Sequence, residues 1–216
     1  MYRFDHIMYA AADLQSGIDE LEVLTGVRAV PGGSHPGMGT RNALLGLGSQ
    51  QYLEIIAPDP NQDLPGSLGE ALIQHGGSGI RSFAVATDRL AAVETLAEVF
   101  GFASRGLTPM SRTEPELGRL EWRLCFLKHR LLPFFIDWQA SPHPSKTAVK
   151  GCSLMAMTVL LREPSAYREF ISQLDLQTLA LKVQTSTASE PEGFTATLMT
   201  PRGIVELPNW WMTPIP

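Results

Sequence analysis

The chain has 216 residues, of which 44% are hydrophobic and 18% charged, which is enough for a sizeable core and argues against wholesale disorder. Its formal net charge of -5 argues against a nucleic-acid-binding protein, because such proteins present a basic surface. The two cysteines, Cys125 and Cys152, lie in apolar runs without any zinc or CxxC spacing, so we expect buried free thiols. We see no signal peptide and no apolar run of the roughly 18 residues that span a bilayer, so we expect a cytoplasmic protein without membrane contacts.

The N-terminal segment predicts the element order β-α-β-β-β. The short, bounded apolar stretch 3–10 is typical of a strand. A helix over 13–25 follows, because leucines recur at helical spacing, Asp13 suits the N-cap and Gly26 ends the helix. The remaining expected elements are a strand at 27–30, a Gly- and Pro-containing loop at 31–39, and strands at 40–47 and 51–57.

The same order recurs twice further along the chain. The expected elements are a strand at 80–87, a helix at 89–100, strands at 118–127 and 132–138, a polar connection at 139–150, a strand at 153–161, a helix at 164–174 and three short strands after it. The three starts lie roughly 75 residues apart, and a structural repeat implies that each unit packs its apolar face on another. We therefore predict an α+β fold of three βαβββ modules, with a domain at 1–145 that contains modules 3–58 and 80–138, and a third module at 150–216.

The first module carries a family resemblance. The stretches DHIMYAAADL (5–14) and GGSHPGMGTRNALLGLGSQQYLEIIAPDP (32–60) resemble the glyoxalase-like branch of the vicinal oxygen chelate superfamily, which includes glyoxalase I, extradiol dioxygenases and bleomycin-resistance proteins. The resemblance covers about residues 3–145. It implies that two modules pair, within the chain or between two copies in a homodimer, and that their sheets curl into a mixed β-sheet cleft for a small molecule with the helices outside.

The resemblance also implies a metal site. In the superfamily, a His on the first strand and a Glu on the last strand of a module bind the ion, and the matching residues are His6 and Glu54. Alternation along the first strand would place Phe4, His6 and Met8 on one face. Imidazole and carboxylate suit a divalent Zn, Ni, Mn or Fe ion. Glu54 is also a candidate catalytic carboxylate. The structural alternative is a core histidine and a buried acid that accepts hydrogen bonds from an arginine.

The second module departs from this pattern. When Leu14 is aligned with Leu90, Ser82 takes the position of His6. The acid near the end of the last strand is Asp137, which we assign as the second candidate catalytic residue.

The third module departs from it as well. It offers Glu206 but has no histidine on its first strand, so the usual four-ligand site cannot be assembled. The sequence leaves at most a reduced site formed by His6, Glu54 and Asp137, with His35 or His143 as a further ligand from a loop.

Four further residues are candidates for substrate binding. His35 lies between glycines that let a ligand approach the backbone closely. Asn42 can point its carboxamide into the cleft, Arg112 offers a cation for an anionic group, and Trp122 offers an aromatic wall. For each of them the alternative is a purely structural role.

Three functions remain open from the sequence. The first is an enzyme of lyase, isomerase or dioxygenase type that uses a divalent metal in the cleft to stabilise an enolate. The second is a non-enzymatic protein that sequesters a small apolar or aromatic ligand without metal. The third is an assembly module whose acids have no chemical role. The missing second histidine favours the second function.

Overall fold

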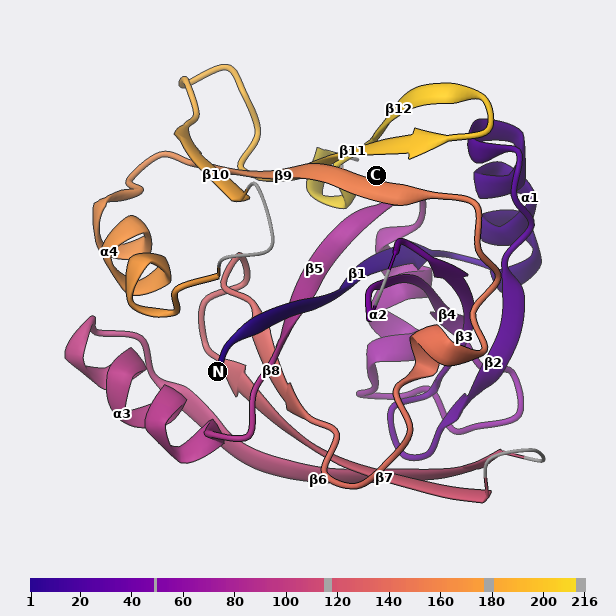
Figure 1. Ribbon diagram of the computed structural model, residues 1–216, viewed down its shortest axis with the longest axis horizontal. Helices are drawn as coiled ribbons and strands as arrows, with labels where there is room; N and C mark the ends of the chain where they lie inside the picture. Colours follow the sequence, from indigo (N-terminus) through magenta and orange to yellow (C-terminus); the bar gives the residue numbers. More distant parts are fainter. Residues whose placement is uncertain (49, 115–117, 177–180, 213–216) are drawn as a thin grey trace.

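The computed structural model describes residues 1–48, 50–114, 118–176 and 181–212, and its strands form an eight-stranded and a four-stranded sheet (Figure 1). The strands of the large sheet follow the order β2-β3-β4-β1-β5-β8-β7-β6. Their bounds are β1 (Arg3–Ala11), β2 (Val30–His35), β3 (Thr40–Gly46), β4 (Tyr52–Pro58), β5 (Ser78–Ala86), β6 (Ser104–Glu114), β7 (Gly118–Leu127) and β8 (Phe134–Asp137). The sheet is mixed and curled, which confirms the predicted α+β fold class with paired modules.

The two halves of the large sheet join edge to edge through antiparallel pairing of β1 with β5. Within each half the first strand pairs in parallel with the last, β1 with β4 and β5 with β8. Both modules that form the cleft therefore come from one chain, and their internal pairing follows the same plan.

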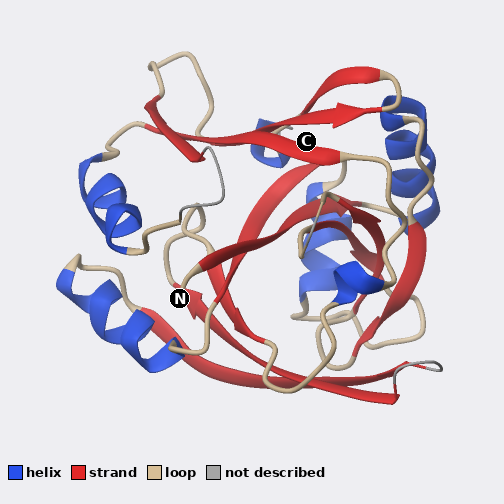
Figure 2. Ribbon diagram, in the orientation of Figure 1, coloured by secondary structure: helices blue, strands red, loops and turns tan. Residues whose placement is uncertain are grey.

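Helices α1 (Leu14–Thr25) and α3 (Leu90–Val99) pack on the convex face of this sheet (Figure 2). The Asp13 side chain accepts a hydrogen bond from the backbone N–H of Ser16, and Gly26 ends α1 in the left-handed conformation at φ 76°. The inner faces of both helices join alternate residues of β1 and β5 in one core, because successive strand residues point to opposite faces.

The four-stranded sheet covers another part of the convex face. Its strands are β9 (Ser153–Leu161), β10 (Leu181–Thr185), β11 (Gly193–Thr200) and β12 (Gly203–Leu207), and helix α4 (Ser165–Gln173) follows β9. The ring of Phe194 packs edge-on against Phe83 of the large sheet, with centroids 5.9 Å apart. This segment has the predicted order of elements, but its last strand pairs with β11 and not with its first strand.

Three segments differ from the sequence-based prediction. Strand β2 covers residues expected to form a loop and shares only Val30 with the strand expected at 27–30, because it is held in place by antiparallel pairing with β3. Strand β6 lies at the sheet edge in a stretch without a predicted element, and an edge strand tolerates Pro109, which lacks a backbone donor. Helix α2 (Leu68–His75), for which no prediction was made, packs Leu72 on the concave face. No helix in the described ranges is long and apolar enough to cross a membrane.

Candidate functional site

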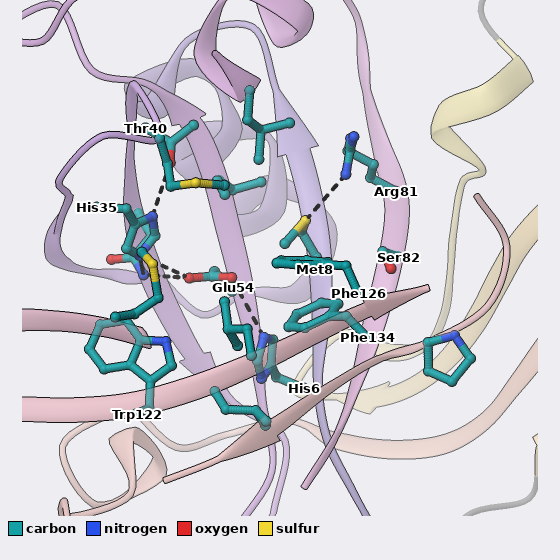
Figure 3. A pocket seen from close by; sticks show the side chains of 18 of the residues that line it. His6, Met8, His35, Thr40, Glu54, Arg81, Ser82, Trp122, Phe126 and Phe134 are labelled. Atoms are coloured by element: carbon teal, nitrogen blue, oxygen red, sulfur yellow. Dashed lines mark hydrogen bonds and ion pairs between the residues drawn. The ribbon is translucent and has the colours of Figure 1, made fainter. Parts of the chain in front are cut away.

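The concave face of the large sheet encloses a cavity of about 520 Å³. Apolar side chains make up much of its wall, including Met8, Trp122, Phe126 and Phe134 (Figure 3). Polar side chains from β1, β2, β3 and β4 are grouped on one part of it. A cavity with mostly apolar walls and a few convergent polar groups is the usual form of a small-molecule site.

Four of the predicted site residues meet there and form what we call the polar cluster: His6, His35, Asn42 and Glu54. Asn42 donates through its Nδ2 to Glu54 Oε1 at 2.6 Å, and the same Nδ2 lies 3.2 Å from His35 Nε2. Its Oδ1 accepts from the backbone N–H of Gly33 at 2.8 Å, and His35 Nδ1 lies 3.0 Å from Thr40 Oγ1. Both amide protons of Asn42 are used if His35 accepts at Nε2, which assigns the proton of a neutral His35 to Nδ1.

His6 faces Glu54 from the neighbouring strand. Its Nε2 lies 3.6 Å from Glu54 Oε2, which is longer than a hydrogen bond, so both atoms keep capacity for a bound molecule. The imidazole stacks on the ring of Tyr52, with centroids 4.5 Å apart. Figure 3 shows His35, Glu54 and His6 following one another across the strands.

Asp5 orients His6 from behind. Its Oδ1 lies 2.6 Å from His6 Nδ1, and its Oδ2 accepts from Trp138 Nε1 at 3.0 Å and lies 3.0 Å from His143 Nε2. Asp5 is fully buried. A carboxylate behind an imidazole fixes the ring orientation and directs the other ring nitrogen toward the cleft.

The position of Asp5 depends on an irregularity in β1. The register between β1 and β5 shifts between Phe4 and His6, and Phe4 belongs to the convex core. The prediction that Phe4 shares a face with His6 and Met8 is therefore wrong, because the irregularity interrupts the alternation of side chains. The same irregularity lets two consecutive residues, Asp5 and His6, interact through their side chains.

The protonation of this cluster follows from its neighbours. Burial raises the pKa of Glu54, but His35, His6 and the Asn42 hydrogen bond outweigh it, so the pKa lies below its usual value. Burial lowers the pKa of His35, although Glu54 opposes the shift. Burial also opposes ionisation of Asp5, yet its hydrogen bonds to His143 and His6 hold that pKa well below 3.8. At neutral pH, Glu54 and Asp5 are carboxylates and His35 is neutral.

The other half of the sheet does not supply a second His and Glu pair. In the parallel pairs, Met8 lies opposite Glu54 and Ala84 lies opposite Phe134, so Phe134 takes in β8 the place that Glu54 has in β4. Ser82 lines the cavity at the position matched with His6. The second half thus has a hydroxyl group in place of the imidazole and a phenyl ring in place of the carboxylate. The Phe134 ring packs edge-on against the ring of His6, with centroids 5.3 Å apart.

These residues do not fit the four-ligand metal site that the family resemblance implies. Among the residues described by the structure, no group of three or more His, Cys, Asp or Glu side chains could hold a metal ion. Three protein ligands is the usual minimum for a catalytic metal. Binding of an ion by His6 and Glu54 alone stays a prediction.

The remaining predicted residues fall in two places. Arg112 and Trp122 line the cavity with the polar group. Asp137 does not: it lies next to a smaller depression, where its Oδ2 accepts from Arg123 at 2.5 Å and its Oδ1 accepts from the backbone N–H of Gln139. The side chain of the preceding residue, Ile136, points into the cavity, so alternation along β8 directs Asp137 away from it.

Sequence reasoning missed three contributors to the site. Asp5 has no expected role on its strand, because a regular strand would direct it away from His6. Trp138 and Arg81 also line the cavity. Trp138 follows Asp137 directly, and Arg81 precedes Ser82, but nothing in a strand pattern separates a cavity arginine from a surface one.

The glyoxalase-like domain model matches residues 4–174. No curated protein matches the sequence. Among solved structures, a hypothetical protein from Staphylococcus aureus is similar, with a TM-score of 0.63 and 19% identity over 95% of this chain and 84% of that one. A methylmalonyl-CoA epimerase from Streptomyces coelicolor has a TM-score of 0.47 and 23% identity over 64% of this chain and 98% of that one. The epimerase from Mycobacterium tuberculosis has a TM-score of 0.46 and 21% identity, with 63% and 88% covered.

The likeness to the Staphylococcus aureus protein shows a shared fold and nothing further, because the two sequences are only 19% identical. The family model covers most of the sequence and includes the strands that carry His6, Asn42 and Glu54. The predicted family is thereby confirmed, and the chain belongs to the glyoxalase-like domain family.

Proposed function

We propose that the protein is an enzyme of lyase or isomerase type that moves a proton on a small molecule bound in the cleft. The observation that carries this proposal is the pair of Glu54 Oε2 and His6 Nε2, 3.6 Å apart in a largely apolar cavity. Each atom belongs to a side chain that other residues hold from behind, while its own side toward the cavity keeps hydrogen-bonding capacity. Such a pair matches the geometry that general acid-base catalysis requires.

Glu54 acts as the base in this proposal. Its pKa lies below the usual value, so the carboxylate is ionised at neutral pH and can accept a proton from a carbon next to a carbonyl group. The C–H bond breaks, the proton moves to Oε2, and the electron pair shifts onto the carbonyl oxygen. Asn42 holds Oε1 and thereby fixes the direction of Oε2.

His6 stabilises the oxygen on which charge develops. Asp5 holds the ring at Nδ1, and in the imidazolium form of His6 both ring nitrogens carry a proton, so Nε2 donates a hydrogen bond or a proton to the enolate oxygen. When the neighbouring carbon also carries an oxygen, the intermediate is an enediolate, and return of the proton from Glu54 to the other of its two carbons completes an isomerisation. Return to the original carbon regenerates the substrate and exchanges its hydrogen with solvent. A dioxygenase reaction of the family's type would instead need a metal. The side chains around His6 and Glu54 that could act as metal ligands do not fit the four-ligand site.

A second candidate function is binding of a small apolar or aromatic ligand without chemistry. The large aromatic side chains Trp122, Phe126 and Phe134 in the cavity wall favour it, because ring contacts supply affinity without any catalytic group. In that case the polar cluster would orient the ligand, and neither Glu54 nor His6 would exchange a proton with it.

Hydrogen exchange distinguishes the two functions. The purified protein is incubated in D2O with phenylpyruvate and with 4-methyl-2-oxopentanoate, which carry acidic hydrogens next to a carbonyl group, and loss of those hydrogens is followed by NMR. We expect exchange above the buffer rate for at least one compound and little above it for Glu54→Gln. Calorimetric binding of a compound without exchange would favour the sequestering function.

A further inference from the structure

The cavity of this acidic protein is lined by positive charge. Four arginines contribute to its wall (Arg81, Arg105, Arg112 and Arg130), whereas Glu54 is the one acidic residue among the described residues that line it. The chain as a whole carries a net charge of -5. The charge of the cavity lining is therefore opposite in sign to the net charge of the chain. A cleft lined by one sign of charge attracts ligands of the other sign.

Arg81 on β5 differs from an ordinary surface arginine. Its Nε is buried without a hydrogen-bond partner, and its Nη1 reaches the sulfur of Met8 at 3.9 Å. No carboxylate of the described residues forms an ion pair with it, and the pKa of its guanidinium is lowered by burial and by Arg105, which carries a charge of the same sign. An uncompensated charge in a desolvated place is unfavourable, which is why buried charges are normally paired.

Aromatic rings hold Arg81 in place without neutralising it. Its guanidinium carbon lies 5.5 Å from the centroid of Trp210 and 5.9 Å from that of Trp211. The indole N–H of Trp211 donates to the Arg81 backbone carbonyl at 3.2 Å, and His75 stacks on Trp210 at 3.6 Å. The 3-10 turn η2 (Trp210–Met212) therefore positions Arg81, although it lies far along the chain.

Arg81 and the polar cluster lie on opposite sides of β1. Glu54 on β4 and Ser82 on β5 are both opposite Met8, and neighbouring strands are ~4.8 Å apart, so the backbones at these two positions are roughly 10 Å apart. Figure 3 shows Arg81 reaching Met8 on one side of that strand while His35 and Glu54 lie on the other. A molecule that spans this distance can contact both groups.

We infer that Arg81 forms an anion subsite and that the ligand of the cleft is an amphipathic molecule with an oxyanion head group. The head group, a carboxylate or a phosphate, binds Arg81 with Arg105 at the rim, and the apolar body lies against Met8 and Phe126. This inference rests on the proposed function only in placing the reacting carbon at Glu54; the anion subsite itself does not depend on catalysis.

Calorimetric titration with octanoate, octyl phosphate and octanol tests the inference, because the three probes share a chain and differ in the head group. We expect at least one anion to bind the wild-type protein about tenfold or more tightly than octanol. Preference for one anion alone identifies its head group as the ligand chemistry. Equal binding of all three, or no binding of any, would overturn the inference.

The variants locate the subsite. Arg81→Met should reduce the preference to within about twofold, whereas Arg81→Lys should retain part of it, since it keeps the charge. Arg119→Gln removes an exposed arginine outside the cavity and should change nothing. An unchanged preference in Arg81→Met would contradict the assignment. If Arg81→Met does not fold, Arg105→Gln at the exposed rim should lower the preference by roughly threefold, and no change there counts against the subsite.

Two further readouts separate this inference from the proposed function. Ligand-free Arg81→Met should melt at a temperature equal to or above that of the wild type, because it replaces a half-buried cation that has no carboxylate partner with an apolar side chain. Glu54→Gln should keep the preference for anions while losing hydrogen exchange. Anion preference without exchange in the wild type would remove the proposed catalysis and leave the subsite standing.

Discussion

The two halves of the large sheet share a strand plan and differ in chemistry. In the first half, His6, Asn42 and Glu54 point into the cavity from β1, β3 and β4. In the second half, Ser82 and Phe134 stand at the positions that match His6 and Glu54. A repeated scaffold therefore carries the polar cluster in one half, and aromatic side chains and arginines in the other.

This difference shows how a symmetric fold can produce an asymmetric site. Two identical halves would bring two identical pairs of ligands together, as the four-ligand metal site implied by the family resemblance would need. Here the second half supplies a phenyl ring at 5.3 Å from His6 and a cationic side chain, Arg81, further along the wall. The cavity thus has distinct ends, which suits an amphipathic molecule better than a small symmetric one.

Substitutions at matched positions of the two halves should change the rate of hydrogen exchange to very different extents. Glu54→Gln should lower the rate of hydrogen exchange by about 10²–10⁴-fold, because it removes the proposed base while keeping the shape of the side chain. Phe134→Leu, at the matched position, should lower it by less than about fivefold, since it alters only packing. NMR exchange rates of both variants measure the difference. Similar losses in both would mean that the polar cluster has no special role.

Asp5→Ala should be the most destabilising single change in the site. Asp5 interacts with His6 of the first half and with Trp138 and His143 after the second half, so its loss leaves buried donors without an acceptor. We expect the free energy of unfolding to fall by about 3–5 kcal/mol. Urea denaturation measures it, with Asp13→Ala, at an exposed helix cap, as a control that should cost about 1 kcal/mol.

Making the halves alike should create a metal site. The double variant Ser82→His/Phe134→Glu places a second His and Glu pair opposite His6 and Glu54, and it should bind Zn²⁺ or Ni²⁺ about 100-fold more tightly than the wild type. Titration calorimetry checks the affinity, and circular dichroism checks that the variant folds. Tight stoichiometric binding by the wild type, abolished in His6→Ala, would instead support the two-ligand prediction.

The smallest expected effect concerns pH. The pKa of buried His35 is lowered, so unfolding allows it to take up a proton, and its contribution to stability is complete above 6.5 and is lost as the pH falls below that value. The slope from this residue cannot exceed about 1.4 kcal/mol per pH unit. Between pH 6.5 and 5, unfolding free energies of the wild type should therefore fall more steeply than those of His35→Gln.

The buried carboxylates change protonation in a lower pH range, so they do not affect the comparison of the wild type with His35→Gln. The pKa values of Glu54 and Asp5 are lowered from 4.5 and 3.8, so their contributions are lost only as the pH falls below these values. His129 also has a lowered pKa, but it is present in both proteins and cancels in the difference. Parallel slopes for the wild type and His35→Gln would show that His35 is not held neutral.

Elements with local sequence signals could be predicted without knowledge of the fold. Helical spacing after Asp13 and before Gly26 predicts α1, and the apolar strands 40–47 and 51–57 are found close to their predicted places. The inward direction of Glu54 follows from the alternation along a regular strand, since Tyr52 and Ile56 line the cavity with it. These features depend on neighbours within a few residues and need no knowledge of the fold.

The contacts between side chains in the site could not be predicted in this way. Asp5 joins His6 because the register of β1 is interrupted, and Asp137 points away from the cavity because Ile136 points into it. Strand β6 forms because β7 offers it a partner, and Trp211 reaches Arg81 from 130 residues along the chain. These contacts depend on pairing between distant segments, on strand irregularities and on charge burial, and none of these leaves a periodic signal in the sequence.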